Sequence, residues 1–185
     1  MIVKQIVLSL LLLFIVFFAL RVIWGLLDFL FRKNESAMYV PSFNRHIRLM
    51  KDQLKIISWK KLVDLWCGDG KAMRFFTEAF GLQCDGYELQ RFPYRYGRFC
   101  NFALWFPTIN LYKKNFLQVD IGRYDYIYVY LLPHQMADIE SRIFKNIAPH
   151  AIVISNSFQF VEHKPYEVIK DRKGKASIFL YRKNG

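Results

Sequence analysis

The chain has 185 residues, of which 54% are hydrophobic, 18% aromatic and 23% charged. This length supports one domain rather than two, and the apolar content excludes a disordered chain. The low cysteine count of three excludes a disulfide-stapled scaffold. The chain has 27 Lys and Arg residues against 15 Asp and Glu residues, which gives a net charge of +12. A basic surface favours nucleic acid or acidic lipid as a partner, or serves solubility alone.

An uncharged apolar segment opens the chain. Between Ile6 and Leu20 the one polar residue is Ser9, and apolar residues on both sides lengthen the segment to the roughly 20 residues that a membrane span needs. A cleaved signal peptide is the alternative, but no small-residue cleavage site follows and the sequence continues apolar. We therefore predict a transmembrane or interfacial anchor helix in residues 1–33 and a separate domain in residues 34–185.

Basic residues flank this segment unequally. Arg32 and Lys33 follow it, whereas Lys4 is the one basic residue before it. The positive-inside rule then predicts a single-pass membrane protein whose domain lies on the cytoplasmic side, or on the matrix side of a mitochondrial membrane. The lipid bilayer is thus one expected partner.

The remaining chain alternates segments of helical and strand periodicity. In chain order we expect a helix from Ser42 to Leu54, a strand at 62–65, a helix at 72–80, a strand at 83–87, a helix from 93 to 105, strands at 109–112 and 124–132, a helix at 136–147, and strands at 151–154, 166–169 and 177–181. This order predicts an α/β fold with a Rossmann-like, doubly wound, mostly parallel seven-stranded sheet. The charged turn at 170–175 predicts one antiparallel edge strand.

The turn after the first predicted strand carries the clearest functional signal. Asp64 lies within this strand and turn, and Gly68 and Gly70 form a turn that permits close approach of a ligand to the backbone. Glu88 ends the second predicted strand, 18 residues after Gly70, where a carboxylate can accept hydrogen bonds from both ribose hydroxyls. A dinucleotide fingerprint requires a third glycine where Met73 stands. Asp64 instead suits a cationic ligand end, such as an amino-acid ammonium.

In these residues the sequence resembles the class I S-adenosylmethionine-dependent methyltransferases, which have an acid before a glycine loop and a second acid after the next strand. The resemblance implies that Asp64 and the two loop glycines hold the methionine part of S-adenosylmethionine and that Glu88 holds its ribose. It places Asn115 and Phe116 beside the adenine, where the family more often has Asp. Trp66 occupies the first glycine position of the motif, as an aromatic residue does in some RNA and DNA methyltransferases of this class.

Four segments, Tyr39–Ser42, Val63–Lys71, Gly86–Glu88 and Tyr130–Pro133, resemble the small membrane-anchored protein-lysine methyltransferases, a branch that includes the enzyme acting on the ATP synthase c-subunit. This resemblance implies methyl transfer to a lysine of a membrane-embedded protein. Alternatives are a lipid or other small membrane acceptor, and a cofactor-binding or non-catalytic module, which the tryptophan in the loop suggests. A third alternative is an RNA-binding or RNA-modifying protein, which the basic charge suggests.

The residues after the fourth predicted strand are candidates for the acceptor site. Methyl transfer is an in-line displacement that depends strongly on positioning, and a lysine must be neutral to attack. His134 is a candidate general base, although a surface position at a helix start is the interpretation we favour. Tyr130 is a candidate lysine-channel residue through cation–π contact, whereas we assign Tyr128 to the core. Leu131 cannot accept a hydrogen bond from an exocyclic amine, which argues against adenine methylation in DNA.

The cysteines and the aromatic residues have structural interpretations. We expect Cys67 to be a buried filler and Cys84 and Cys100 to lie in the core. No Cys and His cluster has metal-ligand spacing, so we predict no metal. Arginines interleave with aromatic residues in 91–106, a pattern that fits base stacking or a membrane interface. Given the anchor, we favour packing with membrane contact over nucleic acid.

Overall fold

The computed structural model describes residues 2–31, 44–171, 174 and 176–183. The chain divides into two compact units, Met1–Met38 and Tyr39–Gly185. The expected domain boundary between residues 33 and 34 and the expected helix start at Ser42 both lie outside the described residues.

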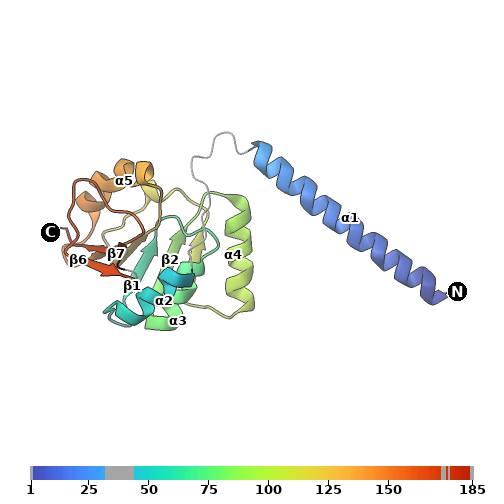
Figure 1. The fold of residues 1–185 in the computed structure, drawn as a ribbon, viewed down its shortest axis with the longest axis horizontal. Coiled ribbons are helices and arrows are strands. Elements are labelled where there is room, and N and C mark those ends of the chain that lie inside the picture. Colours follow the sequence, from blue (N-terminus) through green and yellow to red (C-terminus); the bar gives the residue numbers. More distant parts are fainter. Residues whose placement is uncertain (1, 32–43, 172–173, 175, 184–185) are drawn as a thin grey trace. The chain divides into compact units, whose positions relative to one another are not determined.

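The first unit contains one long helix, α1 (Ile2–Phe31), drawn in blue in Figure 1. By length and composition, Lys4–Ile23 can cross a membrane, and its side chains are exposed throughout. One such helix near the N-terminus fits a membrane anchor and a signal sequence alike.

The second unit is built on one seven-stranded sheet with the order β3-β2-β1-β4-β5-β7-β6 (Figure 1). The strands are β1 (Lys61–Asp64), β2 (Gln83–Tyr87), β3 (Ile109–Tyr112), β4 (Tyr126–Val129), β5 (Ile152–Asn156), β6 (Glu167–Lys170) and β7 (Ala176–Tyr181). The first five strands are parallel, and β7 is antiparallel to both β5 and β6. The predicted doubly wound sheet with an antiparallel edge is thus confirmed.

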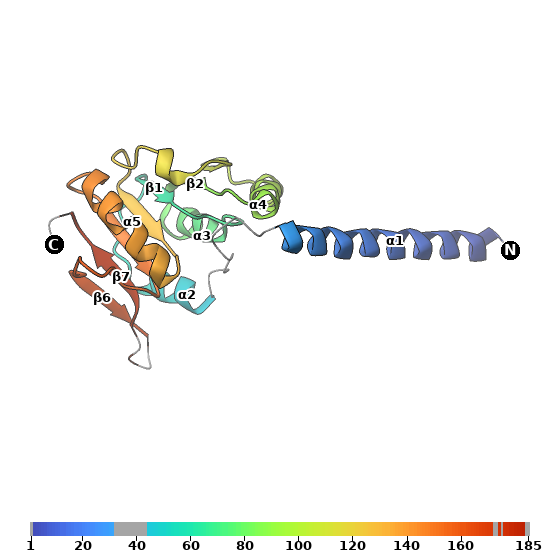
Figure 2. The same ribbon diagram turned by 90° about the horizontal axis from the view of Figure 1, so that it is seen from above.

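Helices cover both faces of this sheet. They are α2 (Asn44–Gln53), α3 (Lys71–Phe80), α4 (Arg91–Ala103) and α5 (Pro133–Asn146), with a short 3₁₀ helix η1 (Phe116–Gln118) before β4. Apolar residues of α5 share one core with Val63 and Ile127, while those of α2 and α3 share the other with Leu62 and Tyr128. Figure 1 shows α5 above the strands and α2 and α3 below them. In Figure 2, α4 and the β6–β7 pair lie at opposite ends of the sheet.

Several element bounds differ from the expected ranges by a few residues, and three differences bear on packing. The fourth strand is shorter than the predicted range 124–132, because the chain leaves the ladder after Val129 and Pro133 begins α5. The helix expected to reach residue 105 ends at Ala103. Cys100, expected in the core, is half-exposed, because α4 packs through a different face.

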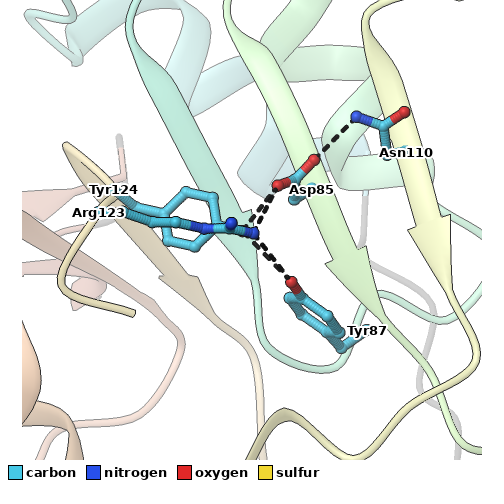
Figure 3. A network of polar contacts seen from close by, with 5 residues as sticks. All are labelled: Asp85, Tyr87, Asn110, Arg123 and Tyr124. Carbon is cyan, nitrogen blue, oxygen red and sulfur yellow. Dashed lines mark hydrogen bonds and ion pairs between the residues drawn. The ribbon is translucent and has the colours of Figure 1, made fainter. Parts of the chain in front are cut away.

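A polar network joins β2, β3 and the segment that enters β4 (Figure 3). Asp85 accepts hydrogen bonds from the Tyr124 hydroxyl at 2.7 Å and from the Asn110 amide at 2.9 Å. The Arg123 guanidinium lies 3.4 Å from the same carboxylate and also donates to the hydroxyls of Tyr124 and Tyr87. Tyr87 is the last residue of β2, and Glu88 follows it directly. The network therefore holds the strand end that precedes Glu88.

Candidate functional site

Asp64 ends β1 as a buried carboxylate. In the parallel register it stands opposite Gly86 of β2 and Tyr128 of β4. Its Oδ1 accepts the backbone N–H of Trp66 at 3.2 Å. Burial raises the pKa of Asp64 to about 7; the Trp66 N–H opposes this rise, and two neighbouring acids add to it. A buried carboxylate in such surroundings is stabilised when a cation lies beside it.

Glu88 connects the end of β2 to the glycine loop. Its Oε2 accepts the backbone N–H of Gly68 at 3.0 Å, and its Oε1 accepts that of Gln90 at 2.7 Å. Beside this pair, the N–H of Cys67 bonds to the carbonyl of Tyr87 at 3.1 Å. Glu88 therefore positions the glycine loop that follows Asp64.

Glycine is required in the loop and in the helix that packs on it, for two different reasons. Gly68 and Gly70 have φ values of 54° and 77°, in the left-handed region that other residues rarely adopt. Gly97 of α4 is required by close approach, because a Cβ there would lie 2.6 Å from the carbonyl oxygen of Asp69. The helix α4 therefore packs directly on the loop backbone.

Arg74 of α3 fastens the loop from the other side. Its Nη1 donates to the carbonyl of Asp69 at 2.7 Å and to the Asn101 amide oxygen at 3.0 Å. Its Nη2 lies 3.3 Å from the Asp69 carboxylate. One guanidinium thus joins the loop, α3 and α4, so the loop is held before any ligand arrives.

The Trp66 side chain packs beside the predicted adenine segment. The side chain is half-buried against the core, and its ring centroid lies 5.8 Å from that of Phe116. Both rings line a shallow surface recess, together with Leu65, Tyr87, Leu89 and Lys114. Asn115 lies beside it and caps η1 by accepting the N–H of Leu117 at 2.9 Å. The predicted adenine segment and Trp66 are therefore brought together at one apolar recess.

Cys67 is buried inside the loop. Burial, and then the charges of Asp64 and Glu88, raise the pKa of its thiol well above its usual range. A protonated, buried thiol is a poor nucleophile, so this environment favours the filler interpretation.

The carboxyl ends of β4 and β5 carry a second polar group. Burial raises the pKa of Tyr130, and the nearby Ser157 hydroxyl opposes this rise. Ser157 Oγ donates to the Asn156 amide oxygen at 3.0 Å and lies 3.2 Å from Nδ1 of His46 on α2. The amide nitrogen of Asn156 donates to the buried hydroxyl of Tyr128 at 2.9 Å. This acceptor-side network adjoins Asp64, because β4 pairs directly with β1.

Two histidines differ in their surroundings. Burial lowers the pKa of His46, although the Asn156 hydrogen bond opposes this effect and the charge of Arg45 adds to it. His46 is therefore mostly neutral at pH 7. His134, by contrast, is exposed at the start of α5, which is the surface position that we favoured for it.

Sequence reasoning missed His46, Ser157 and Gly97. His46 and Ser157 are 111 residues apart, and no spacing rule connects them. Ser157 has a left-handed φ of 71°, which costs a serine about 1–3 kcal/mol and leaves no sequence signal. Gly97 lies within a helix, where glycine is unfavourable, and that signal could have indicated a close contact.

Comparisons with known proteins agree with this geometry. The model of the family "ANTKMT methyltransferase domain" matches residues 64–167. A protein-lysine N-methyltransferase from Saccharolobus islandicus (strain REY15A) is 26% identical over 148 residues, which cover 77% of this chain and 91% of that protein.

Solved structures share the fold. An RNA methyltransferase from Salinibacter ruber, in complex with S-adenosyl-L-homocysteine, matches with a TM-score of 0.69 and 19% identity over 77% of this chain and 93% of that one. The cyclopropane synthase MmaA2 from Mycobacterium tuberculosis matches with a TM-score of 0.53 and 18% identity over 68% and 46% of the two chains. Because the family model covers more than half of the sequence and begins at Asp64, the chain belongs to the ANTKMT methyltransferase domain family, within the class I S-adenosylmethionine-dependent methyltransferases.

Proposed function

We propose that this methyltransferase transfers the methyl group of S-adenosylmethionine to a lysine side chain of a protein at a membrane surface. The observation that carries the proposal is the pairing of β1 with β4, which sets the buried Asp64 beside the strand that leads to Tyr130. A cofactor end and an acceptor end are thereby adjacent along one edge of the sheet, where ligands bind in open α/β sheets.

The residues of the first end suit S-adenosylmethionine. The raised pKa of Asp64, about 7, reflects a buried carboxylate that the ammonium of the methionine part would stabilise. Glu88, as a carboxylate with about four acceptor positions, would accept the ribose hydroxyls while it holds Gly68. The recess lined by Leu89 and Phe116 offers apolar surface to the adenine ring. S-adenosylmethionine would supply a methyl group bonded to a sulfonium sulfur, and the leaving group would be the neutral thioether.

The residues of the second end suit an amine. Tyr130 is half-buried near Ser157, and its hydroxyl oxygen would accept an N–H of the incoming amino group. Such a bond orients the nitrogen lone pair for in-line attack, and orientation supplies much of the acceleration in such displacements. His134 remains a candidate base, since it lies exposed just beyond β4.

Two further observations support a protein substrate at a membrane. The Saccharolobus relative bears the name protein-lysine N-methyltransferase, and the segment after β4 carries Leu131 and Leu132 rather than the acidic or amide side chain that an exocyclic base amine requires. The apolar, exposed α1 would tether the domain to a bilayer. Tethering raises the effective concentration of membrane-bound acceptors without new contacts.

The test is methyl transfer from S-adenosyl-[methyl-³H]methionine by the full chain, reconstituted in vesicles with solubilised membrane proteins. Acid hydrolysis and amino-acid analysis should place the label in methyl-lysine. Asp64→Asn should abolish labelling, whereas Asp52→Asn, a matched change at an exposed position of α2, should leave it unchanged. Label in extracted lipid or in RNA would contradict the lysine acceptor, and tight cofactor binding with no transfer would contradict the enzymatic role.

A further inference from the structure

Helix α4 packs on the rest of the domain through small or polar side chains. Its buried residues are Pro93, Gly97 and Asn101, which recur every four positions and so lie on one face. Gly97 rests on the loop backbone at Asp69, and Asn101 accepts a hydrogen bond from Arg74. None of the three buried residues is a large apolar side chain.

The large apolar side chains of α4 point the other way. Phe99 is 65% exposed and Phe102 is 80% exposed, and Phe92 and Tyr96 are also exposed. A surface helix normally buries its aromatic residues and exposes its polar ones. The reversed pattern makes a contiguous apolar surface of the kind that marks an interaction site.

Trp105 extends this surface beyond the end of the helix. The N–H of Phe106 bonds to the carbonyl of Asn101 and that of Trp105 to the carbonyl of Phe102, the two bonds of a Schellman motif. Trp105 takes the left-handed position with φ 55°, which glycine ordinarily occupies, and its side chain is 80% exposed. The sequence thus places a large aromatic ring at an unfavourable backbone conformation while most of its surface stays exposed.

Positive charge accompanies these rings. Arg91, Arg95 and Arg98 are exposed on α4, which contains no acidic residue. A groove of about 410 Å³ between α4 and β3, lined in part by Arg98, Phe102 and Trp105, hollows the same surface. Aromatic rings mixed with arginines are typical of the headgroup region of a bilayer, and the charge complements anionic lipid.

We propose that the exposed face of α4, formed by Phe92, Arg95, Phe99, Phe102 and Trp105, lies on the headgroup region of an anionic bilayer. The proposal rests on the membrane location argued above, and does not depend on lysine as the acceptor. Twelve residues, 32–43, stand between α1 and α2 in the sequence, and a chain of that length reaches at most about 43 Å, so an inserted α1 would keep the domain within reach of the lipid surface.

This contact gives α4 a role in the reaction. Because Gly97 rests on the carbonyl of Asp69, the glycine loop lies one helix thickness behind the proposed bilayer contact. A domain held by α4 presents the carboxyl edge of its sheet to acceptors near the membrane surface in one fixed orientation. A flexible tether alone would leave that orientation free.

The test uses the tryptophan fluorescence of the full chain, reconstituted in vesicles of phosphatidylcholine and phosphatidylglycerol with or without brominated acyl chains. The difference between wild type and Trp105→Phe isolates the emission of Trp105. Bromine should quench at least half of that emission, and 0.5 M salt or the triple change of Arg91, Arg95 and Arg98 to Gln should reduce the quenching at least threefold. Should Trp105→Phe fail to fold, an environment-sensitive dye on Phe102→Cys in a Cys100→Ser background, compared with that background alone, gives the equivalent readout.

The outcomes separate this inference from the membrane location. If the full chain does not float with the vesicles, the location is wrong and the inference fails with it. If the chain floats while Trp105 stays unquenched, the anchor stands and the inference is overturned. Shielding of Trp105 by added RNA or soluble protein, but not by lipid, overturns it as well. Val161→Ser, which changes a 76% exposed apolar residue in the segment between β5 and β6, is the matched control and should leave quenching unchanged.

Discussion

The carboxylate of Glu88 accepts the backbone N–H of Gly68 at 3.0 Å, so the acid at the end of β2 holds the loop that leaves β1. One side chain therefore has two tasks, since the proposed ribose ligand also preorganises the glycine loop. Loss of this carboxylate should affect the cofactor site in the ligand-free protein as well as in the complex.

Glu88→Gln should weaken S-adenosylmethionine binding about 10- to 100-fold, because a bond to a charged acceptor contributes about 1.5–3 kcal/mol. If the amide nitrogen of the new side chain faces the Gly68 N–H, two donors meet. Calorimetric titration measures the change. Glu78→Gln, at an exposed position of α3, should bind as wild type does, and equal affinity of the two variants would contradict the role of Glu88.

Asp64 should make ligand-free stability fall as pH rises. Its pKa is raised from 3.8 to about 7, so between these values the folded protein holds a proton that the unfolded chain has lost. The free energy of unfolding therefore decreases with rising pH across this window. At pH 8, Asp64→Asn should melt a few degrees above wild type, and near pH 4 the two should converge. Thermal unfolding from pH 4 to 8 measures this, and a constant difference would contradict it.

The Asp64 carboxylate should make cofactor affinity rise with pH, whereas it makes ligand-free stability fall. Protonation of Asp64 removes the charge that attracts the ammonium, so wild-type affinity for S-adenosylmethionine should decline as pH falls from 8 to 6. Asp64→Asn should bind weakly at both values. A wild-type affinity that does not change over this range would place the ammonium elsewhere.

Gly97→Ala should lower the free energy of unfolding by about 1–3 kcal/mol, as overpacking commonly does. The new Cβ would lie 2.6 Å from the Asp69 carbonyl and 2.8 Å from the Leu111 side chain, and a backbone atom cannot give way as a flexible side chain can. Urea denaturation measures the loss, and cofactor affinity should fall with it. Arg95→Ala, on the exposed face of the same helix, should stay within about 0.5 kcal/mol of wild type.

Removal of the Ser157 hydroxyl should slow methyl transfer and spare cofactor binding. Ser157→Gly preserves the left-handed backbone at φ 71° and deletes the hydroxyl that lies 3.2 Å from Nδ1 of His46 and near Tyr130. We expect kcat to fall about tenfold, the value of one lost hydrogen bond, with an unchanged dissociation constant for S-adenosylmethionine. Tyr130→Phe should behave in the same way. A fall in cofactor affinity without a change in kcat would assign this network to stability alone.

Much of the fold could be predicted from patterns among neighbouring residues in the sequence. The strand Gln83–Tyr87 coincides with its predicted range, and α3 ends at Phe80 as predicted, before the capping Gly81, because alternation, apolar spacing and glycine are properties of neighbouring residues. Asp64, Gly68, Gly70 and Glu88 could be selected in the same way, since each lies at the end of an element that short-range pattern defines.

Contacts distant in sequence needed the tertiary structure. Nothing near His46 indicates that it would approach Ser157, and nothing near Gly97 indicates that Asp69 would lie against it. The length of α4 was nearly correct from its sequence, but which of its faces would be buried depended on the loop that it meets. Sequence by itself determined the elements and the acidic and glycine residues at their ends, because these follow from local backbone and burial preferences. Tertiary structure decided which elements pack together, and so which polar groups share a site and which aromatic rings remain exposed.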